Sequence, residues 1–294
     1  MKILVLGVTG MLGSMVFRLF SNSPGYIAWG TMRSHSALKL FSQQEQSRIV
    51  SGVDVLDLDS LLRVYGEVRP DVVINCIGIT NKRDEMENSF LVIQINSLLP
   101  HRLATICEAA SARLVHISTD CVFSGVKGGY KESDSANADH LYGQSKRLGE
   151  IEGKTHVITL RTSIVGHGLV PNESLVDWFL AQKGSVKGYK RAIFSGLPTM
   201  ELARVIRDFV IPNRELYGLY HVAAEPIDKF SLLSMVRQKY SKDIEIIPDE
   251  EFVIDRSLDS ARFREATGYK APDWEKLVDI LYQSYELGSG NVPK

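Results

Sequence analysis

The sequence predicts an α/β protein with a doubly wound parallel sheet, followed by a second, smaller and discontinuous α/β lobe. Short apolar runs alternate with helical patterns through the first 165 residues, which is the order expected when helices link parallel strands by right-handed crossovers. Several runs, such as Ile3–Leu6, are apolar throughout, as in strands that are covered on both faces. After Gly166 the pattern changes to helices with isolated short strands such as 218–223, which predicts the second lobe.

Each element of the first part is predicted from its own pattern. Continuous apolar runs predict strands, and apolar residues at helical spacing predict helices. In chain order we expect a strand at 2–6, a helix at 11–20, a strand at 26–32, a helix at 58–65, a strand at 71–77, a helix at 89–110, a strand at 113–118, a helix at 142–151 and a strand at 157–161.

Composition excludes several classes of protein. The 294 residues are 44% hydrophobic and carry a formal net charge of −1, so there is no electrostatic case for binding nucleic acid or an anionic membrane. We find no apolar segment long enough to span a bilayer. The three cysteines lack CxxC spacing, which predicts a cytoplasmic protein with neither a disulfide framework nor a metal site.

A glycine loop follows the first strand and opens the first helix. It reads Gly7-Val8-Thr9-Gly10-Met11-Leu12-Gly13. Glycines suit this turn because its backbone must approach a pyrophosphate closely, and the helix N-terminus offers free N–H groups to the phosphates. The loop therefore predicts a dinucleotide site, although ordinary strand–helix turns are also rich in glycine.

The residues after the second strand favour NADPH, with NADH as the other possibility. An NAD site places an acid there to bind the ribose 2′-hydroxyl, whereas this chain has Arg33 and Ser34. Arg33 can pair with a 2′-phosphate and Ser34 can add a hydrogen bond. The alternative for Arg33 is a solvated loop residue. Asp54 and Val55, after the third strand, are candidates for the adenine edge.

Tyr142 and Lys146 stand four residues apart on a predicted helix, so their side chains share a face. A tyrosine is a poor acid at neutral pH unless a nearby cation lowers its pKa, and we expect Lys146, helped by the charge of the oxidised nicotinamide, to supply that shift. Thr119, at the end of a buried strand, can polarise the same carbonyl, or it can simply cap the next turn. A glycine loop, a strand-end hydroxyl and this pair together predict a carbonyl-reducing site.

With these motifs the chain resembles the extended short-chain dehydrogenase/reductase family, and within it the dTDP-4-dehydrorhamnose reductase group. The resemblance runs along nearly the full length. It is carried by Gly7–Gly13, Asp71–Asn75, Ile95–Asn96, Ser118–Gly125, Tyr142–Glu150, Leu160–Ser163, Gly196–Thr199, Gly218–Ala223 and Leu258–Ser260 with Phe263.

The resemblance implies a set of site residues. Thr119, Tyr142 and Lys146 would be the catalytic triad, and Asn96 would organise the helix beneath Lys146. Further cofactor contacts would come from Cys76, Ile77, Gly78, Asn96, Thr162 and Ser163, and substrate contacts from Thr80, Cys121, Val122, Phe123 and Arg256. Arg256 could pair with a substrate phosphate or could be a surface arginine.

Two departures from the group's pattern bear on the substrate and the assembly. Cys121 stands where the group commonly has tyrosine, so one contact near the sugar is missing and the identity of the sugar is open. Ser14-Met15 lack the glutamate that some members use at a magnesium-linked dimer contact. We therefore expect neither that metal site nor that dimer, while another homodimer remains possible.

The resemblance implies an NADPH-dependent reductase of a nucleotide-linked 4-keto-6-deoxysugar, in deoxysugar and surface polysaccharide biosynthesis. Residues 1–165, with 192–215 returning to them, would bind the cofactor, and 166–191 with 216–294 would bind the substrate. An epimerase or dehydratase is a second interpretation, although dehydratases commonly have Asp-Glu where this chain has Asp120-Cys121. A non-catalytic regulatory subunit that binds NADP is a third. The nucleotide, the sugar and the stereochemistry stay open.

Overall fold

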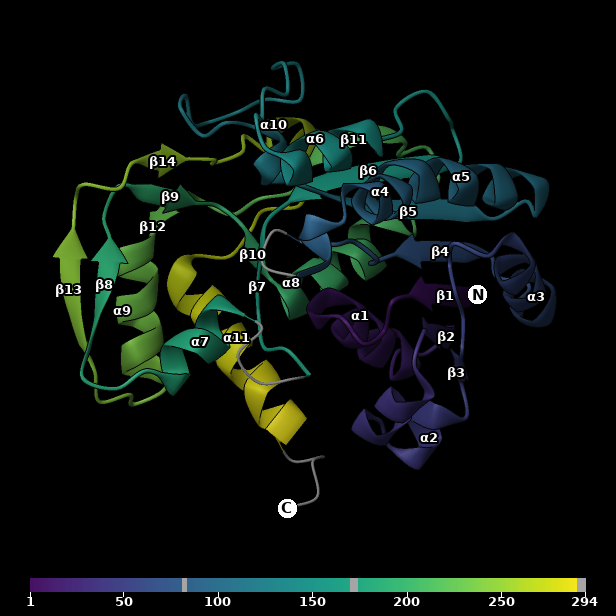
Figure 1. The fold of residues 1–294 in the computed structure, drawn as a ribbon, viewed down its shortest axis with the longest axis horizontal. Coiled ribbons are helices and arrows are strands. Elements are labelled where there is room, and N and C mark those ends of the chain that lie inside the picture. The colour runs from purple at the N-terminus through teal and green to yellow at the C-terminus, as the bar shows by residue number, and fades with distance from the viewer. Residues whose placement is uncertain (81–83, 170–173, 290–294) are drawn as a thin grey trace.

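The computed structural model describes residues 1–80, 84–169 and 174–289. Within these residues a seven-stranded parallel sheet forms the centre, in the order β11-β6-β5-β4-β1-β2-β3 (Figure 1). Its strands are β1 (Lys2–Leu6), β2 (Ile27–Met32), β3 (Ile49–Ser51), β4 (Val72–Asn75), β5 (Arg113–Thr119), β6 (Val157–Thr162) and β11 (Gly218–His221). The strand order reverses between β1 and β4, and ligands of such sheets bind beyond the carboxyl ends at that point. The predicted fold class is confirmed.

Helices cover both faces of this sheet, as the apolar strands predicted. Along β1, Ile3 and Val5 pack into one hydrophobic core, while Leu4 and Leu6 pack into the other. The first core includes residues of α1 (Met11–Ser21) and α8 (Thr199–Val205), which pack against each other. The second core includes residues of α3 (Leu58–Val68) and α5 (Leu99–Ala109). The short α2 (Gln43–Gln46) precedes β3.

The long helix expected at 89–110 has three parts. α4 (Ser89–Val92) leads into a π-helical stretch, Ile93–Leu98, and then into α5. Pro100 lies in the first turn of α5 and has no N–H for the carbonyl of Asn96, so the wider π turn accommodates the missing bond. The sequence pattern showed the helix but not this distortion.

The stretch Ser89–Ala109 is also long and apolar enough, by length and composition alone, to cross a membrane. The expectation that no apolar segment is long enough to span a bilayer is therefore wrong. About half of the stretch is buried inside the structure, and its buried residues Leu99 and Leu103 belong to the second core. Such burial is what a core helix of a globular protein shows.

The helix expected at 142–151 ends earlier. α6 spans Leu141–Leu148, and Gly149 caps its C-terminus. The chain then turns inward, so that Glu150 and Ile151 are buried. A Cβ on Gly149 would overlap the backbone carbonyl oxygen of Asn96, so a glycine is required where α6 ends.

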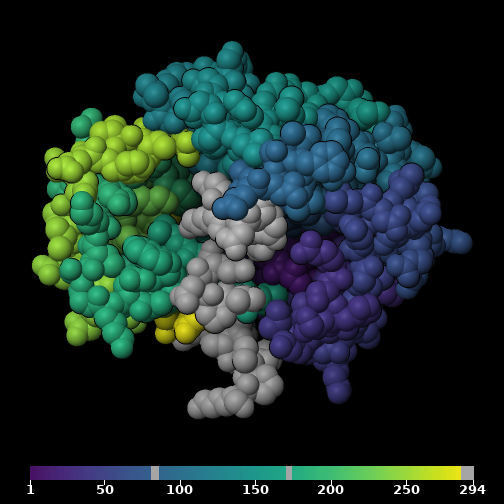
Figure 2. Space-filling model, viewed as in Figure 1, coloured from purple at the N-terminus to yellow at the C-terminus, as the bar shows by residue number. Residues whose placement is uncertain are grey.

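The remaining elements form the smaller lobe, which lies beside the main sheet (Figures 1 and 2). β8 (Ser185–Tyr189) pairs with β13 (Glu245–Asp249), and β9 (Ala192–Phe194) pairs with both β12 (Ile227–Asp228) and β14 (Ile254–Asp255). β7 (Ile164–Val165) pairs with β10 (Leu197–Pro198), and the helices here are α7 (Leu175–Ala181), α9 (Lys229–Lys239) and α11 (Trp274–Ser289). The exception is α10 (Ala261–Thr267), which packs against β11 of the main sheet.

One expectation about this region is wrong. The strand expected at 218–223 is not isolated in the small lobe, because β11 pairs with β6 and is an edge strand of the main sheet. Its four residues are all buried. The sequence of a short strand does not show which strand it pairs with, because tertiary packing decides the pairing. The residue boundaries of the two domains otherwise stay predictions.

Candidate active site

Two adjoining cavities, of about 670 and 430 Å³, lie at the carboxyl ends of the central strands. Gly10, Cys76, Ile77 and Gly78 line both, so the two form one continuous site. The predicted residues that line the first cavity are Gly10, Met11, Leu12, Cys76, Ile77, Gly78, Thr80, Thr119, Cys121, Tyr142, Lys146, Thr162 and Ser163. Those lining the second are Gly7, Thr9, Gly10, Arg33, Asp54, Val55, Cys76, Ile77 and Gly78.

The glycine loop forms a cradle between β1 and α1. Gly7 has a φ of +84°, which favours glycine, and a Cβ there would lie 2.8 Å from Ile77 Cγ1. Gly10 caps α1 and supplies no side-chain hydrogen bond to the helix. The first N–H groups of α1 therefore remain available to a ligand at this end of the cavity. These features fit the phosphates of a dinucleotide.

Gly13 has a different role from a cofactor contact. It is buried in α1 and lines neither cavity. A Cβ at this position would overlap the carbonyl oxygen of Gly7. Gly13 therefore allows the helix to approach the loop closely and positions the cradle indirectly.

The second cavity extends toward the end of β2. Arg33 is exposed and lines it, together with Asp54 and Val55. The Asp54 carboxylate also accepts a hydrogen bond from the Leu56 N–H (2.9 Å), so it stabilises its own turn. Ser34 does not line the cavity, and its hydroxyl lies 2.8 Å from that of Ser36.

Asn96 holds the cavity wall from behind rather than lining it. Its side chain is buried, accepts a hydrogen bond from the Ile79 N–H and donates one to the Ile79 carbonyl, both at 2.9 Å. It also donates to the Ser145 hydroxyl of α6 (3.1 Å). Asn96 thus ties the segment after β4 to the helix that carries Lys146.

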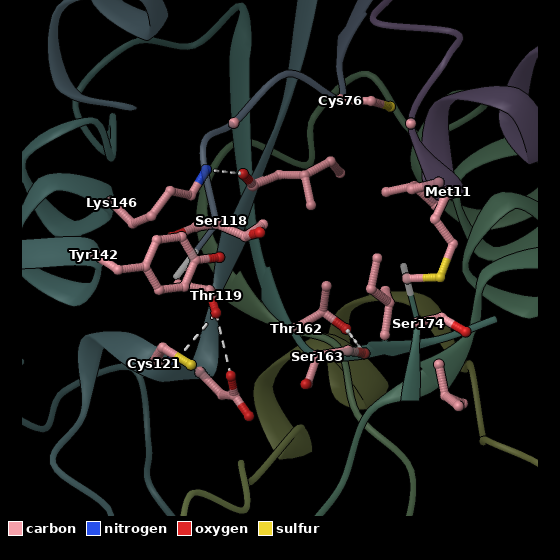
Figure 3. Close-up of a pocket in the computed structure, with 18 of the residues that line it drawn as sticks. Met11, Cys76, Ser118, Thr119, Cys121, Tyr142, Lys146, Thr162, Ser163 and Ser174 are labelled. Carbon is pink, nitrogen blue, oxygen red and sulfur yellow. Dashed lines mark hydrogen bonds between the residues drawn. The ribbon is translucent and has the colours of Figure 1, made fainter. Parts of the chain in front are cut away.

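Tyr142 and Lys146 project from α6 into the first cavity beside the end of β5 (Figure 3). Lys146 is buried, and its ammonium donates a hydrogen bond to the Ile117 carbonyl (2.7 Å). The Thr119 hydroxyl donates to Asp120 (3.1 Å) and accepts from the Cys121 N–H (3.1 Å). The structure therefore brings Thr119, Tyr142 and Lys146 to one wall of the cavity.

The pKa values at this wall differ from one expectation. Burial raises the pKa of Tyr142 above its ordinary value, the Cys121 thiol raises it further, and a hydrogen bond with Thr119 opposes the shift. Lys146 was expected to lower the pKa of Tyr142, but the net shift here is upward because burial dominates. Burial also lowers the pKa of Lys146 to about 8, against the opposing effect of the Glu150 carboxylate.

Cys121 lines the cavity with Arg256 directly behind it. The Arg256 guanidinium donates to Cys121 Sγ (3.6 Å) and to the Phe123 carbonyl (2.9 Å), and its Nη2 lies 3.3 Å from His140 Nε2. Burial raises the pKa of Cys121 to about 12, so the thiol stays protonated at neutral pH. Arg256 itself does not line the cavity.

Val122 and Phe123, predicted as substrate contacts, are fully buried and line neither cavity. They form a small core with Tyr130, on whose ring Phe123 stacks at a centroid distance of 4.1 Å. Their side chains therefore support the wall and do not reach a ligand. The predicted contacts at these two positions are not supported, since an apolar run cannot reveal which face it buries.

Several residues that line the first cavity were missed. They come from the small lobe and from the segments that join it to the sheet: Ile164, Val165, Ser174, Leu175, Phe194 and Lys229. The Lys229 ammonium lies 4.3 Å from the centroid of the Phe194 ring. No motif marks these positions, and Lys229 comes beside Phe194 only because β12, which precedes it, pairs with β9.

A doubly wound sheet, a glycine cradle and a Thr–Tyr–Lys wall define an extended short-chain dehydrogenase/reductase. The family model described as the RmlD substrate binding domain matches residues 1–286, and the chain belongs to this family. The resemblance to the dTDP-4-dehydrorhamnose reductase group is thereby confirmed.

Two related sequences cover most of the chain. Methionine adenosyltransferase 2 subunit beta of Danio rerio is 27% identical over 254 residues, which are 82% of this chain and 74% of that protein. The dTDP-4-dehydrorhamnose reductase of Aggregatibacter actinomycetemcomitans is 24% identical over 253 residues, or 78% of this chain and 86% of that protein. The match to the Mycolicibacterium smegmatis reductase is 31% identical but covers 57% of this chain and 46% of that protein.

Solved structures share the fold over nearly the whole chain. The dTDP-4-dehydrorhamnose reductase of Bacillus anthracis, in complex with NADP, superposes with a TM-score of 0.78 at 21% identity, covering 96% of this chain and 98% of that one. A hypothetical dTDP-4-dehydrorhamnose reductase from Sulfolobus tokodaii gives a TM-score of 0.74 at 27% identity, covering 94% and 98%.

Proposed function

We propose that this protein is an NADPH-dependent reductase that acts on the 4-keto group of a nucleotide-linked 4-keto-6-deoxysugar. The observation that carries the proposal is the convergence of Thr119, Tyr142 and Lys146 on one wall of a cavity whose other side is the glycine cradle. Family membership supports it, as do the reductases among the relatives and the solved structures.

Residues of the cradle would hold the cofactor. The α1 N-terminus and the Gly7–Gly13 loop fit the pyrophosphate, and Arg33 would pair with the 2′-phosphate. Cys76, Ile77 and Gly78 would line its path, and Thr162 with Ser163 would lie near the nicotinamide. When bound, NADPH supplies a hydride to the carbonyl carbon.

The chain's own groups would handle the oxygen of that carbonyl. The Thr119 hydroxyl would hydrogen-bond the oxygen, and the Tyr142 hydroxyl would donate the proton that completes the alcohol. Burial raises the pKa of Tyr142, so its hydroxyl stays protonated but is a weaker acid, and the Lys146 ammonium would have to favour the proton transfer. Lys146 would bind the nicotinamide ribose, and its ammonium would stabilise the tyrosinate that Tyr142 becomes when it gives up its proton.

The opposite end of the first cavity would take the nucleotide sugar. Thr80 is exposed at its rim, and Lys229 lies within it beside Phe194. Lys229 offers a cation to a diphosphate, and Cys121 leaves room beside the sugar. Arg256 would hold the Cys121 side chain in place from behind the cavity wall.

The deciding experiment is a screen of NADPH oxidation across a panel of 4-keto nucleotide sugars carrying dTDP, UDP or GDP. We expect turnover with at least one member, and loss of turnover in Tyr142→Phe by a factor of about 10² or more with NADPH binding retained. Unchanged turnover in Tyr142→Phe would show that the proposed proton donor is wrong. Absence of turnover across the panel, with NADPH bound, would favour a non-catalytic subunit.

A further inference from the structure

A buried ion pair lies directly beneath the proposed catalytic wall. The Glu150 carboxylate is completely buried, and the Arg161 side chain is 2% exposed. Glu150 Oε1 accepts hydrogen bonds from the Ser118 hydroxyl (2.6 Å) and from Arg161 Nε (2.8 Å). Oε2 accepts from Arg161 Nη2 (2.8 Å) and from Arg147 Nη1 (3.1 Å). The carboxylate is thus fully satisfied on both oxygens.

A contribution to stability does not by itself explain why this ion pair is buried. Replacing a buried ion pair by apolar residues of similar volume is often neutral or stabilising, because two charges must lose their hydration. A pair retained at this depth is therefore weak support for the fold alone. Its location suggests another role, since it joins the end of β5, the end of α6 and the end of β6.

The partners of Glu150 are neighbours of the proposed catalytic residues. Ser118 immediately precedes Thr119 on β5, and Glu150 follows Lys146 by four residues, just after the end of α6. Lys146 in turn donates to the carbonyl of Ile117, the residue before Ser118. The carboxylate and the ammonium therefore fasten the same strand end to the same helix.

Resting on the function proposed above, we infer that Glu150 is a positioning residue whose carboxylate fixes the strand end of Thr119 against α6 and supplies the counter-charge for Lys146. Arg161 anchors it, and its Nη1 continues the contact to His221 Nε2 (3.3 Å) on β11. His221 Nδ1 donates to the Tyr130 carbonyl (3.0 Å), so the pair also reaches the loop after β5.

Among the described residues, Glu150 and Cys76 are the groups that raise the pKa of Lys146, and of the two only Glu150 is charged at pH 7. Burial raises the pKa of Cys76, at the end of β4, to about 12, so this thiol is neutral at pH 7. Burial lowers the pKa of His116 on β5 well below its ordinary value, so it is neutral too. Tyr142 on α6 is protonated for the reason given above. Burial and the Glu150 carboxylate then act in opposite directions on the pKa of Lys146.

The test is the pH dependence of Lys146 acetylation by acetic anhydride, followed by peptide mass spectrometry on the folded protein. The wild-type midpoint is expected near the pKa of about 8. In Glu150→Gln the midpoint should fall by about one pH unit, because the counter-charge is lost. A merely structural role predicts the opposite sign, since looser packing would hydrate the ammonium and raise the midpoint.

Two further variants keep the test decisive. Glu150→Gln leaves Arg161 unpaired, so the double variant Glu150→Gln/Arg161→Gln removes both buried charges and should fold. Its midpoint should also fall, but by less than in Glu150→Gln, because the guanidinium charge that partly offsets the carboxylate is removed with it. Glu152→Gln is the matched control: its side chain is 53% exposed and also pairs with Arg147, and its midpoint should match the wild type.

A midpoint that stays or rises in folded Glu150→Gln and in the double variant would overturn the inference. If neither Glu150→Gln nor the double variant folds, the inference is also overturned, because the Glu150–Arg161 ion pair would then be required for folding. Acetylation needs no turnover, so a negative screen with the sugar panel and a negative result here remain distinguishable.

Discussion

The Lys146 ammonium donates a hydrogen bond to the Ile117 carbonyl at 2.7 Å, which places a buried cation on the last residues of β5. Lys146 is 4% exposed and shares the cavity wall with Tyr142 and Thr119. A charge at such a position costs stability unless it is compensated, and residues kept at that cost are typical of functional sites.

Lys146→Met should therefore stabilise the protein at neutral pH while abolishing turnover. The pKa of Lys146 is about 8 in the folded state against 10.5 for the unfolded reference, so the unfolded chain binds more protons between these pH values. Wild-type stability should thus rise with pH from 8 to 10.5, and the variant's advantage should fade over that window. At pH 7 we expect the free energy of unfolding of Lys146→Met, measured by urea denaturation, to exceed that of the wild type by roughly 1 to 3 kcal/mol. Loss of the hydrogen bond to the Ile117 carbonyl reduces this gain.

The control for this variant is Lys154→Met. Its ammonium pairs with Glu108 at the surface and its side chain is 40% exposed. We expect a change within about 0.5 kcal/mol at all pH values. A loss of stability in Lys146→Met at pH 7 would mean that the ammonium is compensated well enough to stabilise the fold.

Arg33→Ala should weaken NADPH binding about tenfold and leave NADH binding nearly unchanged, since only NADPH carries the 2′-phosphate. Fluorescence titration with both cofactors measures this. Arg63→Ala, an exposed position on α3 that lines neither cavity, is the matched control. Equal weakening for both cofactors would show that Arg33 contacts the shared adenosine instead.

Gly13→Ala should destabilise the protein by at least about 2 kcal/mol, because the added methyl group would overlap the Gly7 carbonyl oxygen. Gly66→Ala is the contrasting change, since a Cβ at Gly66 in α3 meets nothing within 4 Å. That variant should gain about 0.5 to 1 kcal/mol from helix propensity. Thermal melts of the two variants should shift in opposite directions, and a neutral Gly13→Ala would contradict the close packing of α1 on its loop.

Asn96→Ala should cost about 2 to 4 kcal/mol, because it leaves the N–H and carbonyl of buried Ile79 without their partners. NADPH affinity should fall as well, since the segment after β4 lines both cavities. Asn22→Ala removes an exposed hydrogen bond to the Arg18 carbonyl and should cost less than about 1 kcal/mol. Similar urea midpoints for the two variants would argue against the role of Asn96 as a clamp.

Local chemistry made much of the sheet domain predictable. The strand 2–6, the helix from Met11 and the glycine loop between them follow from patterns within about twenty residues, and the structure has β1 and α1 with those starts. The spacing of Tyr142 and Lys146 likewise fixes a shared helix face wherever the helix packs.

Long-range contacts were not predictable in this way. Gly218–His221 gave no signal that it pairs with β6, and nothing around Glu150 indicated a partner eleven residues away on a neighbouring strand. Val122 and Phe123 were misplaced for the same reason, because the side of a loop that becomes buried depends on what packs against it.

The sequence by itself determined the fold class, the cradle for a dinucleotide and the family of this protein, because helical spacing, apolar runs and glycine turns act over short distances. Tertiary structure alone decided the seventh strand, the small-lobe wall with Lys229 and the buried support of Glu150 and Arg161 beneath Lys146. Burial is the physical reason, since it sets both which charges must pair and how their pKa values shift, and it exists only once distant segments have packed together.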